Sequence, residues 1–419
     1  MSSVLPPASP SPPSRVRDTL LVLLVAGLAA SISLSEIVLA LLALWLLATR
    51  ATRGGYRALA WPLAGPIVGF TGWTVVTALA SGRTLESLTS AKNLLVLATF
   101  WVVLHALPDA PAARRFVARL AWALAAVSVV AILQVGTCSS ERLYAYDPSL
   151  PPLVRTVFGK CARAHGFFSI YMTLAGVLGA VLLATLPRLE SAGRPRWLAR
   201  LVWLVSATAF GLTFVRGAWL GFAAGVLVML ALLRRRAGAP GVMLLLAAGI
   251  FAVPGVVARI ETIADPADLT ARERLFMIQA GLRLAAEHPL LGIGPGGVKR
   301  AYPEYVPREA VKRATGHLHN TPLQIAVERG LVGLGLWLAI FVDFFVRAGR
   351  VLRRLPRDAE TTRALVVGSV SAVAGFLVAG LFEYNFGDAE VLLVAMIIMA
   401  LPFVVERDRD AAPARIAPA

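Results

Sequence analysis

The chain has 419 residues, of which 58% are hydrophobic and only 16% are charged, and its mean hydropathy is +0.72. Because so little polar surface cannot cover so much apolar surface, this composition excludes an ordinary soluble domain and indicates an all-α, polytopic membrane protein. A formal net charge of +17 would also suit a nucleic-acid-binding protein. The placement of the basic residues, described below, explains that charge as a signal of membrane topology instead.

The chain begins with a Pro- and Ser-rich segment, residues 1–18, which predicts a disordered cytoplasmic tail. Apolar stretches long enough to cross a hydrocarbon layer of about 30 Å then recur along the sequence. Backbone groups in lipid must pair within their own segment, so each stretch is expected to be a helix. The twelve predicted spans cover residues 19–33, 35–48, 59–80, 93–107, 116–135, 167–186, 198–215, 217–233, 241–257, 322–346, 365–382 and 389–405.

Basic residues gather on alternate connections between these spans. The groups lie at 15–17, 50–57, 114–119, 188–200, 234–236, 347–363 and 407–415. Cytoplasmic loops of membrane proteins carry the excess of Lys and Arg, so the N-terminal tail and a C-terminal tail at 407–419 are both predicted to be cytoplasmic. Spans one to nine then occupy residues 19–257, spans ten to twelve occupy 322–406, and a long outer loop at 258–321 separates the two groups.

Cys138 and Cys161 both fall in the loop at 136–165, which this topology places outside the cytoplasm. Paired cysteines persist in oxidising compartments. We therefore predict a disulfide that closes this loop. Two free thiols are the alternative, because separation in sequence does not fix distance in space.

Residues 258–321 form a hydrophilic excursion, and a loop of this length without a span of its own usually carries function. Apolar residues at helical spacing within it predict an amphipathic helix at the membrane interface. That stripe consists of Leu275, Ile278, Leu282 and Ala285. In the glycine-rich run at 290–297, successive backbone N–H groups suit an anion-binding nest, with a plain Gly/Pro turn as the alternative.

His317 and His319 stand just before the tenth predicted span, where Thr321-Pro322-Leu323-Gln324 has the form of a capping box. The positive end of a helix macrodipole disfavours imidazolium there, and a general base must be a neutral imidazole. The alternative is that both histidines only bond to loop carbonyl groups. No metal site is expected, because no nearby acidic or cysteine cluster completes the two ligands of the His-x-His pair.

Arg216 lies between two apolar runs with almost no loop, at their predicted outer end. Guanidinium groups bind phosphate oxygens in a bidentate manner, so Arg216, Arg274 and Arg163 are candidates for a diphosphate cradle. An arginine that extends to lipid headgroups is the alternative for Arg216. Glu383 and Asp388, on the same outer side between the last two spans, either hold these arginines in place or cap a helix.

Three motifs follow one another in a distinctive order. They are Val215-Arg216-Gly217-Ala218-Trp219, then Arg274 followed by His288-Pro289-Leu290-Leu291-Gly292-Ile293-Gly294, then His319-Asn320-Thr321-Pro322-Leu323-Gln324 with Glu328-Arg329-Gly330. In this order they resemble the O-antigen ligase and polymerase superfamily. The resemblance spans roughly Arg163 to Asp388, and the run from Leu381 to Asp388 looks more like the ligase branch.

This resemblance implies a GT-C-like membrane glycosyltransferase, an O-antigen ligase, in the bacterial inner membrane with its active site facing the periplasm. It would move polysaccharide from undecaprenyl diphosphate to a sugar of the lipid A core, by inversion and without a metal or cofactor. Its partners would be that donor, that acceptor and membrane lipids, with no nucleic acid. The family's catalytic residues carry over to Arg216, Arg274 and His319, with His317, Arg272, Arg163, Glu383 and Asp388 as candidate substrate-binding residues.

An O-antigen polymerase and a protein O-oligosaccharyltransferase, such as one that modifies pilin, are the alternatives within the enzyme class. A membrane transporter is the alternative from another class, because twelve spans suit many carriers. Carriers usually place charges near the bilayer midplane. In this sequence Glu36 and Asp343 are the only acidic residues well inside apolar stretches, and both fall near predicted span ends.

Overall fold

The computed structural model describes residues 12–52, 60–137, 162–189, 196–233 and 269–416, and all regular elements in these ranges are helical. In chain order they are α1 (Pro12–Ala30), α2 (Ile32–Thr52), α3 (Ala64–Ala80), α4 (Thr84–Ser90), η2 (Ala91–Ala98), α5 (Thr99–Ala106), α6 (Ala110–Gly136), α9 (Tyr171–Thr185), η3 (Leu186–Leu189), α10 (Arg196–Leu212), α11 (Arg216–Leu233), α14 (Leu269–Glu287), α15 (Val298–Tyr305), α16 (Thr321–Arg354), α17 (Glu360–Ala379) and α18 (Ala389–Ile416). Cys138, Cys161 and the predicted span at 241–257 lie outside the described residues.

Within the described ranges, eight helical stretches are long and apolar enough to cross a membrane, and two more apolar helices are shorter. The eight are Ile32–Thr49, Thr84–Ala106, Ala110–Gly136, Tyr171–Leu189, Arg216–Leu233, Thr321–Arg354, Glu360–Ala379 and Ala389–Asp410, and the shorter two are Ala64–Ala80 and Trp197–Leu212. The chain is therefore an all-α polytopic membrane protein. The count of twelve, which also includes α1 and residues 241–257, stays a prediction.

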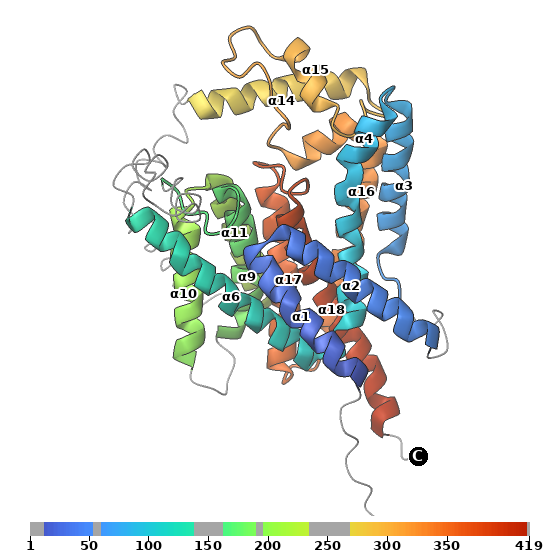
Figure 1. The fold of residues 1–419 in the computed structure, drawn as a ribbon, viewed down its shortest axis with the longest axis vertical. Helices are drawn as coiled ribbons and strands as arrows, with labels where there is room; N and C mark the ends of the chain where they lie inside the picture. The colour runs from blue at the N-terminus through green and yellow to red at the C-terminus, as the bar shows by residue number, and fades with distance from the viewer. Residues whose placement is uncertain (1–11, 53–59, 138–161, 190–195, 234–268, 417–419) are drawn as a thin grey trace, which may run out of the picture.

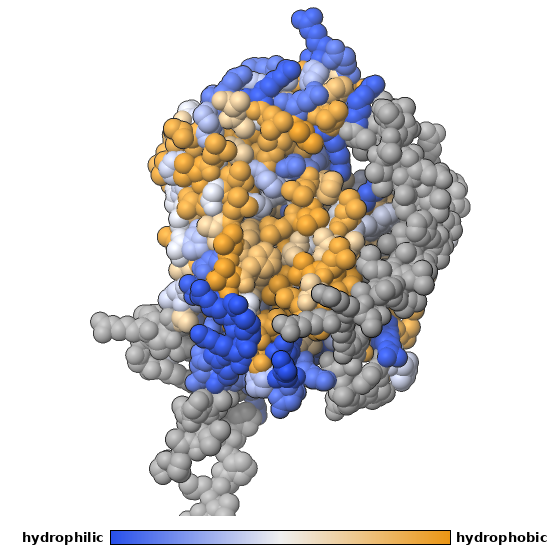
Figure 2. Space-filling model, turned by 180° about the vertical axis from the view of Figure 1, so that it is seen from behind, coloured by the Kyte–Doolittle hydropathy of each residue, from blue (hydrophilic) through white to orange (hydrophobic). Residues whose placement is uncertain are grey.

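The long helices lie side by side in a bundle, and α14 and α15 lie across one end of it (Figure 1). Seen from behind, a broad hydrophobic band covers the middle of the surface, with hydrophilic residues above and below (Figure 2). Large apolar side chains such as Leu44, Val68 and Leu227 are more than half exposed. Side chains of this kind are stable in contact with lipid rather than with water, which fits a bundle that spans a bilayer.

Small residues allow α11 and α17 to pack closely against each other. A Cβ atom added at Gly221 would lie 2.5 Å from the carbonyl oxygen of Gly375, and one at Gly225 would lie 2.7 Å from that of Ser371. Close backbone approach of this kind is the usual means by which helices associate in membranes. At the start of α11, a Cβ atom at Gly217 would lie 2.5 Å from Cβ of Phe382. The first turn of α11 therefore touches the connection between α17 and α18.

Helix α16 is broken at Gly330, where φ is 67° and ψ is −177°. The segment before α15 satisfies the backbone groups that this break exposes. The N–H of Leu331 donates to Pro289 O at 2.7 Å, and the carbonyl groups of Val327 and Glu328 accept from the glycine-rich run at 290–297. A kink in a membrane helix requires such external partners, because no water is present to replace the lost hydrogen bonds.

The N–H groups of the glycine-rich run are therefore used within the protein. Three of them donate to α16: Ile293 to Val327 O, Gly294 to Glu328 O and Gly296 to Glu328 Oε1. Two donate closer in sequence, Gly292 to His288 O and Gly297 to Gly294 O. Of the two alternatives left open by the sequence, the structure favours a structural turn over an open anion site. The carboxylate that the run does bind belongs to the chain itself.

The predicted amphipathic helix is present as α14, but its packed face differs from the apolar stripe chosen from the sequence. Leu275 and Leu282 of that stripe are 51% and 58% exposed. Met277, Ala280 and Leu284 are buried instead, in a second apolar core shared with α15, residues 306–318 and Val327 of α16. One side of the helix packs on this core, and the exposed Leu275 and Leu282 on its other side are available to lipid.

We predict that Gly330→Ala destabilises the protein for two reasons. The backbone has a positive φ at this position, and an added Cβ atom would lie 1.9 Å from Leu290 O. A residue forced into such backbone costs roughly 1–3 kcal/mol before the clash is relieved. The control is Gly335→Ala on the same helix, where a Cβ atom meets nothing within 4 Å and where helix propensity favours alanine. Thermal unfolding of purified protein in detergent should show a lower midpoint for Gly330→Ala only. Equal midpoints for the two variants contradict the prediction.

Candidate active site

The segment that leads into α16 places two histidines next to each other. Leu318, between them, is 1% exposed in the second apolar core, and its N–H donates to Oε1 of Gln324 at 2.9 Å. His319 follows with a left-handed backbone, φ 49°. With Leu318 anchored in the core, the imidazole rings of His317 and His319 lie together, with their centroids 4.3 Å apart.

Asn320 is the N-cap of α16, and its side chain accepts from the N–H of Leu323 at 2.9 Å. The predicted capping box, in which Thr321 was the cap, is therefore wrong by one residue, because asparagine caps at least as well as threonine. Thr321 is already helical. Its hydroxyl lies within hydrogen-bond distance of Glu383 O, at 2.9 Å, and of Asn385 Oδ1, at 3.0 Å. The start of α16 is thereby tied to the connection between α17 and α18.

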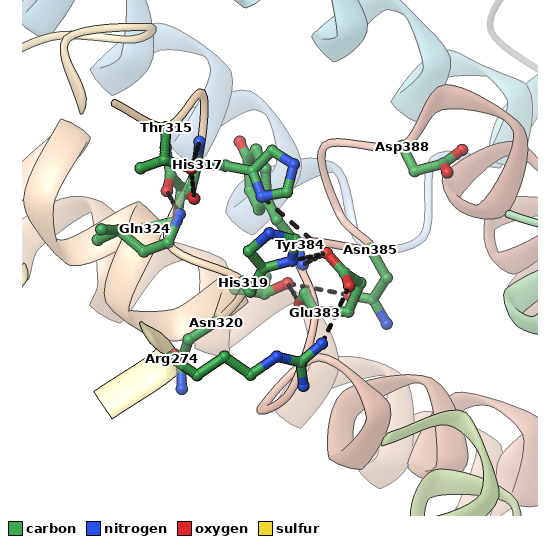
Figure 3. A network of polar contacts seen from close by, with 12 residues as sticks. Arg274, Thr315, His317, His319, Asn320, Gln324, Glu383, Tyr384, Asn385 and Asp388 are labelled. Carbon is green, nitrogen blue, oxygen red and sulfur yellow. Dashed lines mark hydrogen bonds and ion pairs between the residues drawn. The ribbon is translucent and has the colours of Figure 1, made fainter. Parts of the chain in front are cut away.

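Three of the candidate residues, Arg274, His317 and His319, meet at the carboxylate of Glu383 (Figure 3). Its Oε1 lies 2.7 Å from Nδ1 of His319 and 4.0 Å from Nδ1 of His317, and it accepts from the N–H of Tyr384 at 3.1 Å. Its Oε2 lies 3.8 Å from Nη2 of Arg274. Side chains from α14 and from the segment before α16 therefore share one acidic group, which the α17–α18 connection supplies.

Several polar contacts hold Glu383 in this position. The N–H of Thr321 donates to Gly380 O at 2.7 Å, and the side-chain amide of Asn320 donates to Leu381 O at 2.9 Å. Asn385 Nδ2 donates to Phe376 O at 2.7 Å. Because these contacts fix the backbone on both sides of Glu383, the carboxylate is positioned before any substrate binds.

Burial and hydrogen bonding act in opposite directions on the acidic group. Burial alone would raise the pKa of Glu383, but the hydrogen bond and charge of His319, with the N–H of Tyr384, outweigh burial and lower it. Burial, followed by the neighbouring His319, lowers the pKa of His317. The cluster therefore favours an ionised Glu383 beside a neutral His317 at neutral pH.

Helix α14 carries three neighbouring charged residues that have different contacts. Glu273 is buried, and its carboxylate accepts from the N–H groups of Val311 and Lys312 at 2.8 and 3.0 Å, which anchors the loop before the histidines. Arg274 faces Glu383. Arg272 is exposed, with its guanidinium 6.0 Å from the ring centroid of Phe276. Of the two arginines that the sequence left as alternatives, Arg274 is the one in the cluster.

The remaining candidates have other surroundings. Arg216 is the first residue of α11, next to the glycine that packs on Phe382, so it stands close in sequence to the contact with the Glu383 loop. Arg163 lies over the ring of Tyr171, 4.4 Å from its centroid. Asp388 lies to one side of the cluster (Figure 3).

Asp388 has the helix-capping role that the sequence left open. It accepts from the N–H groups of Glu390 and Val391 at the start of α18 and from the hydroxyl of Thr173, at 3.1, 3.2 and 2.5 Å. Burial raises the pKa of Asp388. Glu383, by contrast, contacts one of the predicted arginines.

Sequence analysis missed a buried polar network behind the histidines. The carboxylate of Glu328 accepts from Arg329, Gln324 and the N–H of Gly296 at 2.8 to 2.9 Å. Burial is the largest influence on Tyr384 and raises the pKa of its phenol to about 12. This network and His317 border a cavity of about 290 Å³. The triplet Glu328-Arg329-Gly330 was visible as a motif, but nothing local in the sequence showed that its charges are buried.

His317, His319 and Glu383 also form a set that could hold a metal ion, with one ligand atom from each residue within 4.8 Å of the others. The sequence-based expectation against a metal rested on the lack of a nearby acidic ligand. The structure supplies that ligand from a residue 64 positions beyond His319.

The fold and this cluster define a polytopic membrane protein with a His, Arg and Glu site at one end of its helical bundle. A family model described as O-antigen ligase matches residues 201–338, which include Arg216, Arg274 and His319. This match supports the assignment to the O-antigen ligase and polymerase superfamily, in agreement with the three motifs. It implies a glycosyltransferase-like membrane enzyme. A search of the curated proteins finds no match.

We predict that Glu383→Gln lowers the thermal unfolding midpoint at pH 7 and that the difference from wild type shrinks in acid. The folded pKa of Glu383 lies below its unfolded value. Its contribution to stability is therefore complete above the unfolded pKa, about 4.3, and is lost as the pH falls through the folded pKa. The measurement is the unfolding midpoint of both proteins from pH 7 to below pH 4.

The control is Glu309→Gln, which changes an exposed glutamate on the same loop as the histidines and should track wild type throughout. A gap between Glu383→Gln and wild type that stays constant down to the lowest pH argues against an ionised, paired Glu383.

Proposed function

We propose that the chain is an O-antigen ligase, a GT-C-like inverting glycosyltransferase that transfers polysaccharide from undecaprenyl diphosphate to a sugar of the lipid A core. The reaction takes place at the periplasmic face of the bacterial inner membrane, at the end of the bundle where α14, α15 and Glu383 lie. The observation that carries the proposal is the 2.7 Å contact between Nδ1 of His319 and Glu383, with Arg274 on the same carboxylate.

His319 acts as the general base in this proposal. A carboxylate accepts only, so the 2.7 Å contact assigns the ring proton of neutral His319 to Nδ1. Nε2 then carries the lone pair and can take the proton of the attacking acceptor hydroxyl. The negative charge of Glu383 stabilises the imidazolium that forms, in the same way that a buried carboxylate supports histidine in other base-assisted reactions.

Arg274 and Arg216 bind the diphosphate of the donor. Charge grows on this leaving group as the sugar bond breaks, and fixed guanidinium groups stabilise such charge. The contact of Arg274 with Glu383 is long, at 3.8 Å, and its side chain is about one-third exposed. Most of the five guanidinium donors therefore stay available for phosphate oxygens. The arginines alone can neutralise the diphosphate, so the mechanism needs no metal.

The acceptor decides between the ligase and the other members of the superfamily. The family in general implies a lipid-linked glycan donor and a lipid acceptor. The ligase receives priority because the run from Leu381 to Asp388 that resembles the ligase branch also contains Glu383, the group that positions His319. A polymerase would use a second lipid-linked glycan as acceptor, and a protein O-oligosaccharyltransferase would use a polypeptide.

We predict that His319→Ala abolishes transfer, with a loss of about 10²–10⁴ in rate, because the acceptor hydroxyl loses its base. The assay combines purified protein with undecaprenyl-diphosphate glycan and, in separate reactions, lipid A core, a second lipid-linked glycan or pilin. Product in the lipid A core reaction identifies a ligase. Wild-type transfer by His319→Ala at equal protein level contradicts the assignment of the base.

We predict that Arg274→Ala reduces transfer by about 10²–10³, the effect of removing one fixed electrostatic donor. Arg272→Ala should have a much smaller effect, because this side chain is exposed near Phe276 rather than paired with Glu383. The matched control is Arg283→Ala, which removes an exposed arginine from the same helix. An equal loss in the Arg272 and Arg274 variants would show that net charge on α14, rather than the geometry around Glu383, supports the reaction.

A further inference from the structure

We propose that His317, His319 and Glu383 form a binding site for a divalent transition-metal ion of the Zn²⁺ class, and that the bound ion inhibits the enzyme. The site goes beyond the proposed function, which uses no metal. Two imidazole nitrogens and one carboxylate oxygen are a ligand set that zinc accepts, with water in the fourth position.

The distances suit such an ion. With bonds of about 2.0–2.1 Å, neighbouring ligand atoms of a tetrahedral zinc site lie about 3.3 Å apart. Nδ1 of His319 lies 2.7 Å from Oε1 of Glu383, and Nδ1 of His317 lies 4.0 Å from the same oxygen. One contact is shorter and the other longer than this value, each by less than 1 Å, and the three ligand atoms all lie within 4.8 Å of one another.

One ligand atom of this set, and the other oxygen of its carboxylate, have no hydrogen-bond partner in the described part of the chain. Within the described residues, Nδ1 of His317 and Oε2 of Glu383 are both buried and have no hydrogen-bond partner. An unsatisfied buried polar atom costs about 1–3 kcal/mol, and a native structure usually has a reason for it. A metal ion coordinated by Nδ1 of His317 would satisfy that atom.

The surroundings supply access and also a limit on affinity. The cavity of about 290 Å³ reaches His317, so an ion and its remaining water ligands can approach from that side. Arg274 opposes a cation, because its guanidinium lies 3.8 Å from Oε2 of Glu383. This arginine disfavours hard ions that rely on charge alone, such as Mg²⁺, more than ions that bond covalently to imidazole nitrogen.

The inhibitory effect rests on the proposed role of His319, whereas binding itself does not. When Nδ1 of His319 coordinates the metal, the single proton of the neutral ring must sit on Nε2. The proton leaves Nδ1 and is replaced on Nε2 from solvent, so no net charge is lost from the ring. Nε2 then has no lone pair for the acceptor hydroxyl. The metal also neutralises Glu383, which would otherwise stabilise imidazolium.

Zinc binding is tested on the full chain, purified in detergent without a polyhistidine tag and stripped with EDTA. Titration with zinc chloride in competition with a chromophoric indicator should show one site per chain. His317→Ala and Glu383→Gln should each weaken that site by about tenfold or more, because each removes a metal-binding atom. His288→Ala is the matched control, since His288 is exposed at the end of α14, and it should bind as wild type does. Absent binding, or binding equal in all four proteins, overturns the site.

Inhibition is tested in the transfer assay, with each protein compared with its own metal-free rate. Zinc should inhibit wild type and His288→Ala, EDTA should restore both, and Mg²⁺ should have no effect. His317→Ala should require about tenfold more zinc for half inhibition. Zinc binding that depends on His317 but leaves transfer unchanged overturns the inhibitory role. A protein that transfers no glycan under any condition but still binds zinc through His317 contradicts the proposed function and leaves the metal site supported.

Discussion

A single carboxylate, that of Glu383, organises the candidate active site. It is the common partner of His319 at 2.7 Å and Arg274 at 3.8 Å, and those residues come from different parts of the chain. A negative charge placed among cationic and neutral nitrogen groups lowers the energy of the whole arrangement, as the lowered pKa of Glu383 shows. The geometry of His319 and Arg274 therefore depends on where the α17–α18 connection holds this one side chain.

The break in α16 at Gly330 is the second feature that positions the site. At Gly330 the helix lacks its own backbone hydrogen bonds, and the segment between α14 and α15 replaces them. These bonds join the α14–α15 segment to the bundle. The carboxylate of Glu328 accepts from the N–H of Gly296 in that segment. The guanidinium of Arg329 donates to the hydroxyl of Thr74 on α3 at 3.1 Å. A buried ion pair contributes little net stability by itself. Here the Glu328–Arg329 pair fixes the register between α3, α16 and the glycine-rich run. The histidine segment directly precedes the part of α16 that carries this pair.

The sequence predicted the helical bundle well and the assembly of the site only in part. Continuous apolar runs can only be helices in lipid, so most predicted spans coincide with helices among the described residues. The face of α14 was mistaken, because residues that pack on a protein core and residues that face lipid are equally apolar. The cap of α16 was misplaced by one residue, because Asn320 and Thr321 are both good capping residues. The pairing of His319 with Glu383 left no local signal at all, since it depends on how α16 and α17 pack.

The same carboxylate also relates donor binding to the position of His319 under the proposed mechanism. Before the donor binds, Glu383 shares its charge between His319 and Arg274. A diphosphate carries more negative charge than one carboxylate and offers bidentate oxygens, so it competes for the guanidinium. As Arg274 turns toward the phosphates, Glu383 loses a cationic neighbour and its charge acts more fully on His319. Under the proposed mechanism, one side chain thus couples the position of the diphosphate to the hydrogen bond that orients His319.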